Sequence, residues 1–175
     1  IQIGAIPKVR DWDDYMARTA QILAVPAAAL HMAAKRGMDV TVLRPEGFEL
    51  PAPVMQKAIF AAEESGGSVT ESSDRTEAME GAHVIYAKSW SSTRHYGDTL
   101  ADQKLREGLM DWCVDESWFE NAKEDCRFMH CLPVRRGVVV DDAILDGPRS
   151  IVIPEARNRM LAQMAVLHQM LGGRQ

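Results

Sequence analysis

Residues 128–137 read FMHCLPVRRG, an apolar segment that runs directly into a loop with an imidazole, a thiol, a proline and two guanidinium groups. The apolar part belongs to a predicted buried β-strand at residues 126–130. In proteins that alternate strands and helices, ligands bind beyond the carboxyl ends of the parallel strands. We therefore expect the loop from His130 to Arg136 to carry the chemistry of this protein.

The segments on either side of this strand alternate between strand-like and helix-like patterns. Further strands are predicted at residues 38–43, 69–71, 83–87 and 151–153. Helices are predicted at residues 27–36, 54–64, 73–79, 100–110, 115–123, 141–145 and 154–171. This alternation predicts an α/β fold with a doubly wound, Rossmann-like parallel sheet and helices on both faces. Since no repeat or linker interrupts it, residues 1–175 are expected to form a single domain.

Composition excludes several classes of function. The net charge of −5 argues against nucleic-acid binding, which requires a basic face. No apolar run reaches the length of a membrane span, and no signal-peptide pattern opens the chain. The three cysteines form no C-x-x-C pair, so we expect neither a disulfide framework nor a zinc site, and a reducing, cytoplasmic compartment. The start at Ile1 rather than Met fits a fragment or a processed product.

Three predicted strand ends carry polar groups that suit an anion. Residues 88–90 read KSW, the loop at 130–136 follows, and residues 155–159 read EARNR. Arginine forks bind carboxylate and phosphate in a planar, bidentate way. Plainer interpretations stay open, because His130 also fits a hydrogen-bonded core histidine and Cys131 a small buried apolar residue. A Cys–His nucleophilic pair is disfavoured, since no Asp or Asn is placed to orient it.

Four strings together resemble the aspartate/ornithine carbamoyltransferase family. They are HCLP at 130–133, EARNR at 155–159, PEGFEL at 45–50 and YAKSW at 86–90, and the resemblance runs from about residue 24 to residue 171. It covers the second, amine-binding domain of that family. The D-x-W-x-S-M-G loop of the ornithine enzymes is absent, and KSW resembles the branch that uses N-acetyl- or N-succinylornithine.

The resemblance implies transfer of a carbamoyl group from carbamoyl phosphate to the side-chain amine of an N-acylated ornithine, giving N-acylcitrulline and phosphate, a step of arginine biosynthesis. It implies no cofactor and no metal. It assigns carbamoyl phosphate to His130 and Arg159, the attacking amine to the Cys131 thiol, and the substrate carboxylate to Lys88. The carbonyls of Cys131 and Leu132 are expected to accept the carbamoyl NH₂. Ser89, Trp90, Pro133 and Arg135 complete the expected substrate contacts.

Departures from the family pattern keep alternatives open. Residues 15–23 lack the proline-rich loop of the acylornithine branch, and Ala27-Ala28 replace its Asn-Ser. The S-x-R-T-R phosphate loop of the family's first domain is absent, and family members are roughly twice as long. We therefore expect a missing N-terminal domain as a partner, and a trimer by resemblance. The alternatives are a non-catalytic module that binds an amino acid or anion, and a carbamoyltransferase for ornithine or another amine.

Overall fold

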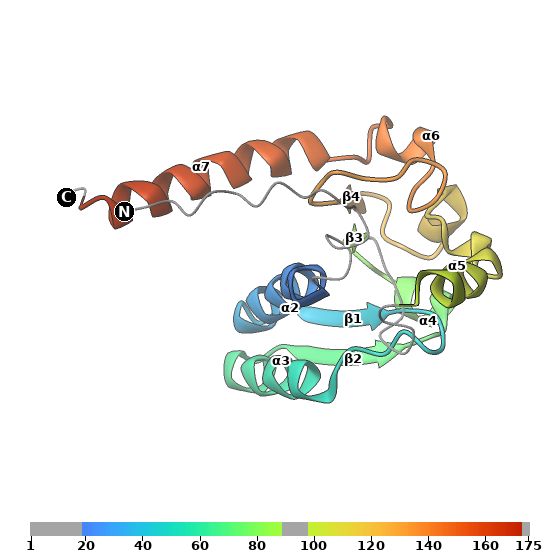
Figure 1. The fold of residues 1–175 in the computed structure, drawn as a ribbon, viewed down its shortest axis with the longest axis horizontal. Helices are drawn as coiled ribbons and strands as arrows, with labels where there is room; N and C mark the ends of the chain where they lie inside the picture. Colours follow the sequence, from blue (N-terminus) through green and yellow to red (C-terminus); the bar gives the residue numbers. More distant parts are fainter. Residues whose placement is uncertain (1–18, 89–97, 173–175) are drawn as a thin grey trace. The chain divides into compact units, whose positions relative to one another are not determined.

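The computed structural model describes residues 19–88 and 98–172, and the chain divides into two compact units (Figure 1). Of the described residues, the first unit takes 19–71 together with 98–106, and the second takes 72–88 and 107–172. The first contains α2 (Thr19–Lys35), β1 (Asp39–Leu43), α3 (Ala52–Ser65), β2 (Ser68–Ser72) and nearly all of α5 (Thr99–Glu107). Each unit is built around its own two-stranded sheet.

The first unit packs two alanine-rich helices beside the sheet of β1 and β2, whose arrows run in the same direction in Figure 1. Its buried core consists of Leu30, Ala34, Ala58, Ala61 and Ala62. Small side chains at these positions let α2 and α3 approach closely, and valines of both strands pack against them.

A close backbone contact joins the end of α2 to the end of α3. The Ser65 hydroxyl donates to the Ala34 carbonyl at 2.5 Å. A Cβ on Gly67 would lie 2.6 Å from the carbonyl carbon of Gly37 and 2.6 Å from the carbonyl oxygen of Met38. Glycine at position 67 is therefore required by the space available. This explains one of the two glycines, Gly66 and Gly67, that follow α3.

The second unit contains the strand predicted at residues 126–130. Its elements are α4 (Arg75–Met79), β3 (Val84–Tyr86), the 3₁₀ turns η1 (Met110–Trp112) and η2 (Glu116–Phe119), β4 (Arg127–Met129), α6 (Asp142–Leu145) and α7 (Val152–Met170). β3 and β4 pair in parallel, with Ile85 opposite Phe128. On the other edge of β4, Phe128 exchanges hydrogen bonds with Arg149 and Ile151 at 2.9 and 3.0 Å. β4 is thus flanked on both sides, and Phe128 and His130 are fully buried.

Most predicted elements are confirmed. The strands predicted at 38–43, 69–71, 83–87 and 126–130 are present as β1 to β4. The helix predicted at 73–79 is present as α4, and the Asp74 carboxylate caps it by accepting from the Glu77 backbone N–H at 3.1 Å. α2 begins at Thr19, well before the predicted start at residue 27. The helix predicted at 115–123 is reduced to the short η2 turn.

The strand predicted at residues 151–153 is wrong. Val152 is already the first residue of α7, and only Ser150 bridges to β4. Three β-branched residues suggested a strand, but Pro154 suits the first turn of a helix, where its missing N–H is not needed. The Glu155 N–H closes that turn on the Ile151 carbonyl at 3.0 Å.

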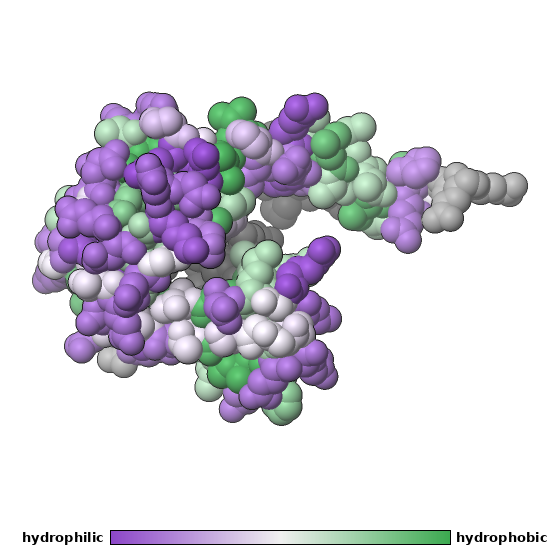
Figure 2. Space-filling model, turned by 180° about the vertical axis from the view of Figure 1, so that it is seen from behind, coloured by the Kyte–Doolittle hydropathy of each residue, from purple (hydrophilic) through white to green (hydrophobic). Residues whose placement is uncertain are grey.

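The apolar residues of α7 lie at the surface. Figure 2 shows hydrophobic and hydrophilic residues interleaved along this helix. Their helical period would suit a buried face, yet the exposed fractions of Met160, Met164, Leu167 and Leu171 are 53–75%. No other element in the described ranges covers them. None of the described helices is both long enough and apolar enough to cross a bilayer.

Candidate functional site

His130 follows β4 directly and is fully buried. The backbone N–H of Leu132 donates to its Nδ1 at 2.9 Å. Because Nδ1 accepts, the proton of the neutral ring resides on Nε2. Nε2 is buried as well, and it has no hydrogen-bond partner among the described residues. The loop thus fixes one tautomer and leaves one buried N–H donor that none of the described residues accepts.

The environment keeps this imidazole neutral. Burial and, as the smaller cause, the positive charge of Lys88 together lower the pKa of His130 from 6.5 to about 4. Lys88 follows β3, and the Ala87 N–H donates to the Met129 carbonyl at 3.0 Å, so the two strand ends lie side by side. At neutral pH the site therefore combines a lysine cation with a neutral histidine donor.

The start of α7 contacts the same loop through two side chains. The Glu155 carboxylate accepts from the His130 backbone N–H at 3.0 Å and from the Tyr86 hydroxyl at 3.1 Å. One turn later, the Arg159 guanidinium donates to the Cys131 carbonyl at 2.7 Å and to the Leu132 carbonyl at 3.5 Å. The structure therefore brings together the ends of β3 and β4 and the first turns of α7.

The backbone of the loop is unusual at Leu132. Its φ of +46° lies in the left-handed region, and the peptide bond to Pro133 is cis. A left-handed conformation costs a residue with a side chain about 1–2 kcal/mol. The hydrogen bond from the Leu132 N–H to His130 favours this conformation. Such backbone conformations concentrate at functional sites, which agrees with the expectation that this loop carries the chemistry.

The two arginines after the loop differ in their roles. Arg136 forms ion pairs with Asp142 at 2.6 Å and with Asp146 at 2.7 Å. The hydrogen bonds and charge of Arg136 hold the pKa of Asp146 below its usual value. The guanidinium of Arg136 therefore ties the loop to α6 and is not part of an anion site. Arg135 is exposed, and its carbonyl accepts from Val139 at 2.9 Å.

The sequence interpretation missed two residues of this cluster, Tyr86 and Glu155. Both lie inside strings that were quoted as motifs, YAKSW and EARNR, yet neither was assigned a contact. The spacing of four residues between Glu155 and Arg159, which places both on one face of a helix, was the available signal. The predicted contacts Ser89 and Trp90 lie outside the described residues.

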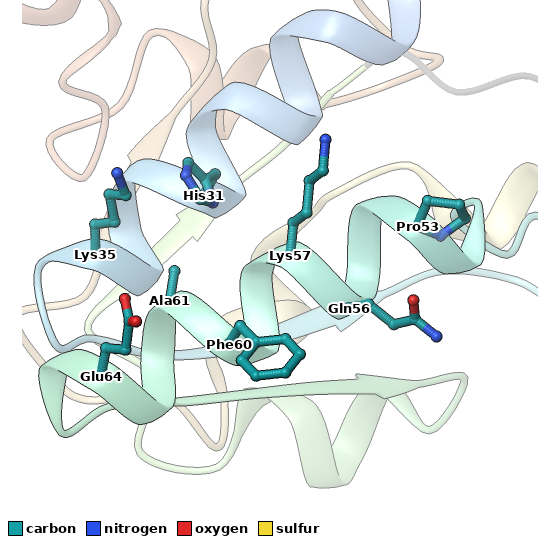
Figure 3. A pocket seen from close by; sticks show the side chains of 8 residues that line it. All are labelled: His31, Lys35, Pro53, Gln56, Lys57, Phe60, Ala61 and Glu64. Carbon is teal, nitrogen blue, oxygen red and sulfur yellow. The ribbon is translucent and has the colours of Figure 1, made fainter.

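A separate hollow lies in the first unit, between α2 and α3 (Figure 3). His31 and Lys35 of α2 and Lys57 and Phe60 of α3 line it, and Phe60 is 68% exposed. It contains none of the predicted site residues. The candidate site is therefore the cluster of strand ends in the second unit.

Comparisons with known proteins agree on one family. The family model described as "Aspartate/ornithine carbamoyltransferase, Asp/Orn binding domain" matches residues 24–170. An ornithine carbamoyltransferase of Halalkalibacterium halodurans is 38% identical over 82% of this chain and 44% of the relative. An N-acetylornithine carbamoyltransferase of Xanthomonas campestris pv. campestris is 38% identical over 85% of this chain and 44% of the relative.

A solved structure gives the same result for the fold. The crystal structure of acetylornithine transcarbamylase complexed with acetylcitrulline matches with a TM-score of 0.76 and 38% identity, over 81% of this chain and 42% of that chain. The present chain spans less than half the length of the relatives it matches.

Proposed function

The chain belongs to the aspartate/ornithine carbamoyltransferase family, and on that premise we propose that it is the amine-binding part of an enzyme that carbamoylates the side-chain amine of an N-acylated ornithine. Carbamoyl phosphate is the donor, and N-acylcitrulline and phosphate are the products. The observation that carries the proposal is the buried Nε2–H of His130, a donor with no described partner, on the loop whose Cys131 carbonyl accepts from the Arg159 guanidinium.

In this proposal the loop acts on the carbamoyl group. The amine attacks the carbamoyl carbon, a C–N bond forms, and the C–O bond to phosphate breaks with its electron pair leaving on phosphate. The amine loses one proton, which the leaving phosphate takes up. Negative charge grows on the carbamoyl oxygen, and donors fixed at that position lower the barrier because they need no reorganisation. The Nε2–H of His130 and the cation of Arg159 supply such donors.

The amine substrate is assigned from the end of β3. Acylation removes the α-ammonium of ornithine and leaves its carboxylate, which requires a cation. Lys88 lies close enough to His130 to lower the pKa of the imidazole, so its ammonium is near the reacting group. Ser89, Trp90, Leu132, Pro133 and Arg135 are proposed as further substrate contacts, and the Cys131 thiol as the contact of the attacking amine.

The proposal includes partners. A phosphate-binding domain of the type found in longer relatives completes the site, and a cytoplasmic trimer is the proposed assembly. The length comparison supports the additional domain, since the relatives are more than twice as long as the matched region.

The test is a transfer assay on the full-length gene product that carries this sequence. Carbamoyl phosphate is offered with N-acetylornithine, N-succinylornithine and plain ornithine, and the ureido product is measured. We expect turnover with at least one acylated amine. Turnover with plain ornithine alone would contradict the substrate assignment. Carboxylate binding that is lost in Lys88→Ala, without transfer to any amine, would instead identify a binding module.

A further inference from the structure

The carboxylate of Glu155 is shared between two strand ends. Its Oε2 accepts from the His130 backbone N–H at 3.0 Å, and its Oε1 accepts from the Tyr86 hydroxyl at 3.1 Å. With each oxygen bonded to a different strand end, the rotation of this carboxylate is fixed. Charge-assisted hydrogen bonds of this type are about twice as strong as neutral ones.

Tyr86 is a permanent donor in this arrangement. Partial burial, the Cys131 thiol and the Glu155 carboxylate all raise the pKa of Tyr86 well above its ordinary value, in that order of size. Its hydroxyl therefore stays protonated across the physiological range. The same hydroxyl donates to the Glu155 carboxylate at 3.1 Å, so it joins the end of β3 to the first turn of α7.

Glu155 and Arg159 hold the loop from one face of α7. The two residues are four positions apart and project from the same side of the helix. Glu155 accepts from the backbone at His130, and Arg159 donates to the backbone at Cys131. The helix thus offers an acceptor, the Glu155 carboxylate, to the N–H of one loop residue. One turn later it offers a donor, the Arg159 guanidinium, to the carbonyl of the next loop residue.

We propose that Glu155, held in place by Tyr86, is a positioning residue that sets where the His130 Nε2–H and the Arg159 guanidinium point. The inference rests on the proposed carbamoyl transfer and extends it to two residues that contact no reacting atom. A purely structural role is the competing explanation, because an acidic residue in the first turn stabilises a helix by itself. That role affects stability alone, whereas a positioning role holds the His130 backbone where the Leu132 N–H reaches Nδ1, so its loss would release the bond that fixes the tautomer.

Three variants and one matched control separate these explanations. Glu155→Ala removes both acceptors. Glu155→Gln keeps one oxygen for the His130 N–H and offers its NH₂ to the Tyr86 oxygen, so it should rescue the arrangement. Tyr86→Phe removes one hydroxyl. The control is Glu71→Gln in the first unit, whose carboxylate also accepts from a backbone N–H, that of Leu50 at 3.2 Å, and from a side chain, that of Arg44 at 3.2 Å.

Two measurements are made on each variant. Nitrogen-15 NMR of the His130 imidazole in this chain reports which ring nitrogen carries the proton. The transfer assay on the full-length gene product reports kcat/KM for carbamoyl phosphate. We expect wild type, Glu155→Gln and Glu71→Gln to show the single Nε2–H tautomer, and Glu155→Ala to show a mixture. In Glu155→Ala kcat/KM should fall about 100-fold, as expected for misplaced catalytic groups, with Tyr86→Phe between it and wild type.

The outcomes are distinguishable. A single Nε2–H tautomer in Glu155→Ala, with only a lower melting temperature like that of Glu71→Gln, would overturn the inference. If Glu155→Ala does not fold, Tyr86→Phe decides instead. A wild-type tautomer together with a wild-type kcat/KM in Tyr86→Phe would also overturn the inference. Failure of wild type to transfer carbamoyl groups would refute the proposed function, while the NMR comparison would still decide whether Glu155 positions His130.

Discussion

His130 illustrates how two explanations for one residue can both hold. Its position at the end of an apolar strand fits a hydrogen-bonded core histidine, and its place before a loop rich in polar groups fits a functional donor. The structure shows a fully buried ring that is bonded at Nδ1 and has no described partner at Nε2. Burial and the bond from Leu132 thus serve to fix the tautomer, and the remaining nitrogen is the one proposed to act on a ligand.

The first residue-scale prediction concerns Lys88. Its positive charge lowers the pKa of His130, so Lys88→Met should raise that pKa above about 4. The pKa should stay below the ordinary value of 6.5, because burial is the larger cause of the shift. NMR titration of the His130 ring measures it, with Lys57→Met of the first unit as the matched control. An unchanged pKa in Lys88→Met would show that the two strand ends are not adjacent.

The same pKa predicts how stability depends on pH. The imidazole takes up a proton near pH 6.5 when the chain is unfolded and near pH 4 when it is folded. Between these values the unfolded state binds more protons, so the free energy of unfolding should fall as the pH falls from 6.5 to 4. The contribution of this one group reaches about 3 kcal/mol. Denaturant unfolding at several pH values tests this, and His130→Gln should show a smaller fall over the same window.

At the scale of elements, local pattern was sufficient where tertiary contacts agree with it. Alternating β-branched residues predicted β1 correctly, and the helix predicted at residues 73–79 is present as α4. The prediction failed at residues 151–153, where β-branched residues form the first turn of α7. The packing of that turn against β4 overrides the local preference, which a single sequence does not reveal. The contacts of Tyr86 and Glu155 were missed because both join segments far apart in the chain.

The close packing of α2 and α3 can be tested at Gly67. Gly67→Ala should lower the free energy of unfolding by about 1–3 kcal/mol or more, because the new Cβ would lie 2.6 Å from two backbone atoms. Gly66→Ala is the control. Gly66 has a φ of +82° but nothing within 4 Å of its Cβ position, so the substitution should cost only about 1 kcal/mol from the backbone conformation. Equal melting temperatures for the two variants would contradict the close approach of α2 and α3.

At the scale of the whole molecule, the α/β class with parallel strands was predicted correctly, and the predicted single domain of residues 1–175 stays a prediction beside the two compact units. The convergence of three segments at one site was anticipated from the rule that ligands bind at the carboxyl ends of strands. The third of these segments was predicted to be a strand end, but it is the start of α7. The apolar residues of α7 lie exposed although a helical period of apolar residues is typical of a buried face, and a single sequence does not show what such a face packs against.

The most direct test of the central claim is the carbamoyl-transfer rate of the full-length gene product when the donor on His130 is removed. His130→Gln and the matched exposed-histidine variant His83→Gln are compared with wild type, with carbamoyl phosphate and an acylated ornithine as substrates. Loss of one preorganised donor to a developing oxyanion typically costs about 10²–10³ in kcat, so we expect a fall of that size in His130→Gln and none in His83→Gln. Wild-type kcat in a folded His130→Gln enzyme would contradict the account.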